Sequence, residues 1–212
     1  MSPSAPEARP TRQFLLLCLP LLAIAFAIWT VFGQAVALPV VGFANLFLGW
    51  WMPELVEYMS AHPEGALLVS TYGDLNGQIL PAADAGGNLG FIISTMGLSY
   101  SLPFYTALYF ATPRDSYAAG YFKGCVLLYA LILFGLISLA LKELMLNLGE
   151  VFHNAGVAFL PPNGIIAILF QLNTLIIPTL APALIWIGQS RNTTLLEGLF
   201  PEDDNEEEMQ NP

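Results

Sequence analysis

Long apolar runs that lack charge constrain this chain more than any other feature of its sequence. The first run, Phe14 to Phe32, is broken only by Pro20. Its length is close to the ~20 residues that a helix needs to cross about 30 Å of hydrocarbon. Hydrophobic residues make up 56% of the whole chain and charged residues 10%, which is too apolar for a surface that faces water. The sequence therefore predicts an integral membrane protein.

We expect an all-α membrane domain over residues 14–192 with about four transmembrane helices. The predicted spans are 14–33, 93–111, 122–144 and 164–187. Residues 36–52 are also apolar but are broken by Pro39 and end in Trp50-Trp51. Because tryptophan rings favour the headgroup level, this segment predicts an interfacial helix on the outer leaflet. A second full span at 36–52 is an alternative, and so is a signal peptide cleaved after Ala35-Val36-Ala37.

Residues 53–92 differ from their surroundings, because they carry five acidic residues, no Lys or Arg, and many turn-forming residues. Two runs rich in β-formers, Ala66 to Tyr72 and Leu89 to Thr95, flank a loop that contains Asn76-Gly77. This pattern predicts a small extracytoplasmic β-hairpin. Residues 149–163 form the second loop that we expect on the same side.

The few basic residues predict the orientation. They are Arg9, Arg12, Arg114, Lys123, Lys142 and Arg191. Most of them lie near the N-terminus, in or beside the loop between the second and third predicted spans, or just after the fourth predicted span. The positive-inside rule then places both termini in the cytoplasm. Residues 1–13 are expected to form a cytoplasmic N-terminal tail and residues 193–212 a disordered, acidic cytoplasmic tail.

Seven polar residues near the third and fourth predicted spans are candidate partner-binding residues, since polar groups at membrane depth are costly and are functional by default. At 100° per residue, Glu143, Asn147 and Glu150 share one helix face. Snorkelling of a lysine and hydrogen bonds that only join helices are the alternative roles. The candidates are Lys142, Glu143, Asn147, Glu150, Gln171, Asn173 and Thr174.

The sequence contains no motif for catalysis, a cofactor or a metal. Cys18 and Cys125 lie in apolar runs with no metal-ligand spacing around them. Glu150 and His153 would supply at most two metal ligands. We therefore predict a protein without enzymatic activity, cofactor, metal or nucleic-acid partner. An enzyme that uses Glu150 and His153 at the outer surface is the remaining catalytic alternative.

Short motifs along residues 12–192 resemble, in order and spacing, the exosortase H-associated membrane proteins of Gram-negative bacteria. The motifs are Tyr100-Ser101-Leu102-Pro103, Ala111-Thr112-Pro113, Lys142-Glu143-Leu144, Leu148-Gly149, Phe170-Gln171, Ile177-Pro178, Ala181-Pro182 and Trp186. The resemblance implies a multi-pass protein of the inner (cytoplasmic) membrane. It also implies an accessory role in protein sorting, with an exosortase as partner and no chemistry assigned to the family itself.

The exosortases themselves are multi-spanning, transpeptidase-like enzymes that use a Cys nucleophile with His and Arg. The positions of Cys18 and Cys125, inside or near the cytoplasmic ends of predicted spans, argue against such an enzyme here. The tetrapeptide Ile177-Pro178-Thr179-Leu180 repeats the start of the sorting signal in exosortase H substrates, but it lies within a predicted span. The alternative function is a small transporter or channel subunit, with the third and fourth spans lining a wet path.

Overall fold

The structure is a computed structural model that describes residues 10–195 except 115, 192 and 194. Of the predicted tails, residues 1–9 and most of 193–212 lie outside the described residues, whereas residues 10–13 form the start of the first helix. The elements follow in the order α1 (Pro10–Trp51), β1 (Val56–His62), β2 (Gly65–Ser70), β3 (Tyr72–Leu75), β4 (Gln78–Pro81), α2 (Ala82–Ala85), β5 (Gly90–Ile93), α3 (Met96–Ser99), α4 (Ser101–Ala111), α5 (Ala118–Leu148), α6 (Glu150–Asn154), α7 (Asn163–Gln171), the π-helical turn η1 (Leu172–Ile176) and α8 (Ile177–Ser190).

Three helical segments of the described residues are long and apolar enough to cross a membrane. They are Arg12–Trp51, Ala118–Leu148 and Asn163–Ser190, and they contain the predicted spans 14–33, 122–144 and 164–187. The prediction of a fourth span at 93–111 was wrong. Helix α4 has 11 residues, which makes it about 16 Å long, roughly half the thickness of the hydrocarbon.

The start of the predicted span, up to Ile93, is not helical because its apolar β-formers pair with a neighbouring strand; the short helix α3 lies between this strand and α4. Phe91 and Ile93 lie in β5 and face Leu68 and Ala66 of β2. Ser94 then ends the strand, and Pro103 occupies the first turn of α4, where a missing N–H costs least. Short apolar runs of this kind fit a strand or a helix equally well by pattern.

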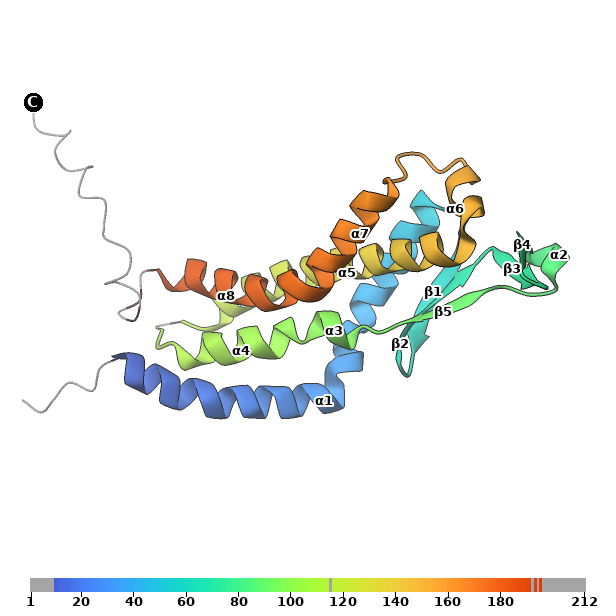
Figure 1. Ribbon diagram of the computed structural model, residues 1–212. Helices are drawn as coiled ribbons and strands as arrows, with labels where there is room; N and C mark the ends of the chain where they lie inside the picture. The colour runs from blue at the N-terminus through green and yellow to red at the C-terminus, as the bar shows by residue number, and fades with distance from the viewer. Residues whose placement is uncertain (1–9, 115, 192, 194, 196–212) are drawn as a thin grey trace, which may run out of the picture.

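Helix α1 contains both the first predicted span and the predicted interfacial segment 36–52. It has 42 residues with Pro20 and Pro39 inside, and Figure 1 shows that it bends between its two halves. Pro39 has no N–H to offer to the carbonyl four residues earlier, which is a common cause of a helix kink. The segment 36–52 is therefore the continuation of the first helix and not a separate helix.

The predicted pairing of residues 66–72 with 89–95 is confirmed, although the sheet is larger than a hairpin. Strand β2 lies between β1 and β5, and both neighbours are antiparallel to it. The intervening loop forms a second hairpin, β3 with β4. Its turn uses Asn76 and Gly77, at φ 58° and 85°, a left-handed conformation that Asn and Gly tolerate best.

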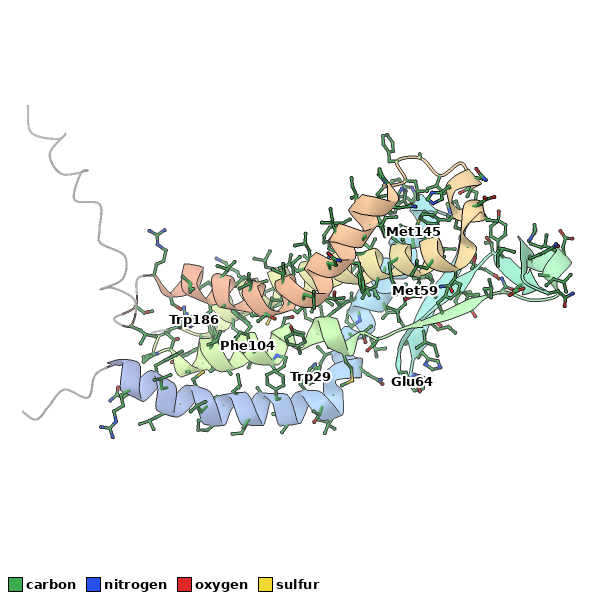
Figure 2. The ribbon with its side chains drawn as sticks, viewed as in Figure 1. Trp29, Met59, Glu64, Phe104, Met145 and Trp186 are labelled. Atoms are coloured by element: carbon green, nitrogen blue, oxygen red, sulfur yellow. The ribbon has the colours of Figure 1, made fainter. Side chains whose placement is uncertain are left out.

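The first half of α1, α4 and α8 run roughly parallel to one another, and the sheets lie at one end of them (Figure 1). Figure 1 shows β1 to β5 and α6 at this end, and the ends of α1 and α8 that lead to the chain termini at the opposite end. Trp186 accordingly lies towards the end opposite Glu64 (Figure 2). We call these the sheet end and the terminal end. The two predicted outer loops, 53–92 and 149–163, thus lie at the same end of the molecule.

Candidate functional site

Helix α5 carries a compact polar cluster near its C-terminus. The Lys142 Nζ lies 2.7 Å from the Glu143 Oε1. The Asn147 Nδ2 donates to the backbone carbonyl of Glu143 at 2.8 Å and to its Oε2 at 3.2 Å. The same Nζ lies 5.2 Å from the centre of the Phe170 ring on α7, which is within the range of a cation–π contact. We call Lys142, Glu143, Asn147 and Thr174 the outer polar cluster.

The ion pair in this cluster is only partly buried. The side chains of Lys142 and Glu143 are each 26% exposed, and an ion pair with this much solvent contributes on the order of 0.2–1 kcal/mol to stability. Stability alone is therefore a weak reason for this charged pair. The pair and Asn147 place polar side chains near the sheet end of a largely apolar helix.

Glu143 and Thr174 face a cleft between the sheet and the helices. The cleft has a volume of about 240 Å³. The Thr174 Oγ1 donates to the backbone carbonyl of Phe170 at 2.7 Å, so its lone pairs remain available as acceptors. The full lining consists of Ile92, Ile93, Ser94, Gly97, Leu98, Leu139, Glu143 and Thr174.

Asn173 has a different environment from the other candidates. It is 1% exposed, and its Nδ2 donates to the Ser138 Oγ at 3.1 Å and to the Leu169 carbonyl at 2.8 Å. Its Oδ1 is buried without a hydrogen-bond partner among the described residues. Asn173 therefore joins η1 to α5 inside the bundle, which favours the helix-joining alternative for this residue.

Glu150 and Gln171 are not part of the cluster. Glu150 is exposed at the start of α6, and Gln171 is exposed at the end of α7. His153, the proposed partner of Glu150 in the catalytic alternative, packs edge-on against Phe152 with ring centres 5.3 Å apart. Within the part of the chain that the structure describes, no three His, Cys, Asp or Glu side chains gather closely enough to hold a metal ion.

A second polar cluster, which was not predicted from the sequence, lies at the terminal end. The Tyr105 hydroxyl donates to the Gln189 Oε1 at 2.7 Å. The Arg114 guanidinium donates to the Gln189 carbonyl at 2.7 Å and lies 4.2 Å from the centre of the Tyr109 ring. The spacing of Gly120 and Gly124 was the available signal, since small residues four apart allow close helix packing in membranes. This cluster joins α4, α5 and α8.

The tetrapeptide that resembles a sorting signal is helical. Ile177 and Pro178 begin α8, and Pro178 is buried. The Thr179 hydroxyl lies 2.8 Å from the Tyr100 hydroxyl at the start of α4. The tetrapeptide therefore contributes to contacts between helices in this structure.

One protein family matches the chain. The sequence model of the family described as exosortase H-associated membrane protein aligns with residues 8–193, which include every element of the fold. This match confirms the resemblance found in the sequence. No curated protein and no solved structure matches the chain.

Proposed function

The chain belongs to the exosortase H-associated membrane protein family, and we propose that it is a non-enzymatic accessory protein that binds the exosortase or its substrates in the inner membrane. The family description supplies the association with exosortase H. The residues that make the contact are the finer part of the proposal. We assign them to the sheet end.

The observation that carries this proposal is the polar cluster beside a cleft at the sheet end, whereas Tyr105, Arg114 and Gln189 at the terminal end are engaged in contacts between helices. The outer polar cluster, the cleft beside it, the sheets and α6 all lie at the sheet end. Along the shafts of the helices, by contrast, the exposed residues include large hydrophobic ones such as Leu19 and Val31, as expected where a helix faces lipid. A partner that recognises exposed polar groups would therefore bind at the sheet end.

The two cysteines support a role without covalent chemistry. An exosortase-like reaction needs a thiol where the sorted protein is cut, outside the membrane. Cys125 is partly buried in the first third of α5, and Cys18 is partly buried in the first quarter of α1. Both positions are towards the terminal end, whereas the outer polar cluster lies towards the sheet end.

The orientation that we propose places the sheet end outside and both termini in the cytoplasm. Arg12, Arg114 and Lys123 lie in or beside the helix ends at the terminal end, where the positive-inside rule expects basic residues on the cytoplasmic side. The chain returns from the sheet end to the terminal end through α3 and α4, which pack against α1, α5 and α8 and do not form a long apolar span of their own. The ends of α1 and α8 consequently lie together (Figure 1).

Co-purification tests the proposal. We expect tagged exosortase H, solubilised in a mild detergent, to retain this protein through affinity and size-exclusion steps. Loss of Glu143 and Asn147 together (Glu143→Gln with Asn147→Leu) should reduce the retained amount, whereas Phe122→Leu, at an exposed position near the start of α5, should not. Repeated absence of the protein from the exosortase fraction, at normal expression, would overturn the proposal.

A further inference from the structure

Strand β5 leaves one edge of the sheet open. The strand order is β1-β2-β5, so β5 pairs with β2 on one side only. The Ser70 amide donates to the Leu89 carbonyl at 2.8 Å. Because hydrogen-bonded pairs alternate along an antiparallel ladder, the next such pairs are Leu68 with Phe91 and Ala66 with Ile93. The backbone N–H and C=O of Ile92 therefore point away from β2.

Apart from its short length of four residues, strand β5 itself carries no Lys or Pro that would block further pairing. Native sheets block their edges with Lys, Pro, a bulge or a covering element. Residues 90–93 read Gly-Phe-Ile-Ile, and the Ile92 side chain is 49% exposed. An open apolar edge of this kind is a template for a strand supplied by another chain.

The open edge continues into the cleft beside the outer polar cluster. Ile92 and Ser94 line one wall of this cleft, and Glu143 lies on the other. A segment that paired with the edge of β5 would run on into this cleft in an extended conformation.

The charge of segment 53–95 as a whole indicates the composition of that extended chain. Residues 53–95 contain five carboxylates and no Lys or Arg. Lys142, the cation beside the cleft, is already paired with Glu143. An occupant that carries Lys or Arg would therefore complement the surface, and an acidic one would be repelled. The five carboxylates belong to Glu54, Glu57, Glu64, Asp74 and Asp84.

We infer that the free edge of β5 and the adjoining cleft bind an extended, basic peptide segment by strand addition. The Ile92 amide and carbonyl pair with the backbone of the segment, and the carboxylates of residues 53–95 attract its Lys or Arg side chains. This site gives the partner chemistry for the sheet end and so rests on the proposed function. Its location at the sheet end suits a segment that lies next to a membrane helix of the partner.

A defined peptide pair tests this site on the full-length protein in nanodiscs of zwitterionic phosphatidylcholine. One fluorescent nonapeptide alternates Lys with Val and Thr, and its counterpart has Glu at every Lys position. We expect the Lys peptide to bind more tightly than the Glu peptide by at least about tenfold. Hydrogen exchange should slow at residues 90–92 when the Lys peptide is bound. Absence of binding by the Lys peptide, or equal binding of both, would overturn the inference.

Two variants at one position separate backbone pairing from side-chain contact. Ile92→Pro removes only an N–H that points away from β2, a position at which sheets tolerate proline. Ile92→Thr keeps this N–H. We expect Ile92→Pro to weaken Lys-peptide binding by about tenfold or more and Ile92→Thr to have a much smaller effect. Equal binding by both variants would overturn strand addition.

If Ile92→Pro does not fold, hydrogen exchange at residues 90–92 of the wild-type protein, with and without the Lys peptide, tests strand addition instead. Exosortase co-purification with a folded Ile92→Pro protein is a separate readout. If the exosortase is still retained while the peptide site fails its test, the proposed function stands without this site. If both fail in the wild-type protein, the proposed function is wrong as well.

Discussion

The hydroxyl of Tyr109 on α4 lies over Gly120 on α5, so close that a Cβ at position 120 would overlap it. The next nearest atom of Tyr109, its Cζ, would be 3.3 Å from that Cβ, a tight contact, so most of the conflict is with the hydroxyl. The same hydroxyl donates to the Tyr117 carbonyl at 3.1 Å. This contact fixes the approach of α4 to α5 at the terminal end.

Gly120→Ala should therefore destabilise the protein. Overpacking of a closed contact typically costs about 1–3 kcal/mol. The second variant, Tyr109→Phe, removes the conflicting oxygen and loses one hydrogen bond, worth about 1 kcal/mol. We expect the double variant Gly120→Ala with Tyr109→Phe to recover part of the loss, as measured by reversible unfolding in detergent.

The matched control for this pair is Gly188→Ala in α8, since a Cβ at position 188 meets nothing within 4 Å. It should leave the free energy of unfolding unchanged or slightly raised, because alanine favours the helix. Additive effects of Gly120→Ala and Tyr109→Phe would show that the two side chains do not conflict.

Asn173→Ala should loosen the contact between η1 and α5. It removes the hydrogen bond to the Ser138 Oγ at 3.1 Å, and such bonds inside membrane bundles are worth roughly 0.6–2 kcal/mol. Ser138→Ala should cost less, because the Asn173 Nδ2 keeps its bond to the Leu169 carbonyl. Unfolding of both single variants and the double variant measures the coupling. If the two effects simply add, this bond contributes nothing.

Glu143→Gln should have little effect on folding and a clear effect on association. The partly exposed Lys142–Glu143 pair accounts for less than about 1 kcal/mol of stability. We expect an unfolding midpoint close to that of the wild type, together with weaker retention on the exosortase. Phe122→Leu, at an exposed position near the start of α5, is the control. Equal retention of both variants on the exosortase would show that Glu143 does not take part in the contact.

The proposed orientation predicts which residues are accessible from outside the cell. In a background of Cys18→Ser and Cys125→Ser, Asp74→Cys and Asn154→Cys should react with a membrane-impermeant maleimide in spheroplasts. Ser116→Cys should react only after permeabilisation. These three positions are exposed or lie in loops and short elements at opposite ends of the molecule. The reverse labelling pattern would invert the topology.

Hydropathy and residue type were enough to predict much of the fold. The spans near 14–33, 122–144 and 164–187 follow from apolar length, and the pairing of β2 with β5 follows from two β-rich runs around a turn. Hydropathy could not distinguish a helix from a strand at Phe91 to Ile93. The strand pairs there and leaves α4 too short to span, which is why the fourth predicted span was wrong.

The candidate site could be predicted only where its residues are close in sequence. Glu143 and Asn147 are one helical turn apart, so their contact follows from helical periodicity. Thr174 joins Glu143 in the cleft through the packing of η1 beside α5, and Ile92 does so through the sheet. Neither placement can be predicted from neighbouring residues in the sequence. The contact of Tyr109 with Gly120 could not be predicted either, although the spacing of Gly120 and Gly124 indicated close helix packing.

Site-specific photocrosslinking in intact membranes is the most direct test of the account. A photoreactive amino acid at Asn147, in the outer polar cluster, and one at Phe122, exposed near the terminal end, are compared in cells that express tagged exosortase H. The account predicts a crosslinked product with the exosortase or one of its sorted substrates from position 147 and little or none from position 122. A product from position 122 alone, or none from position 147 at normal expression, would contradict it.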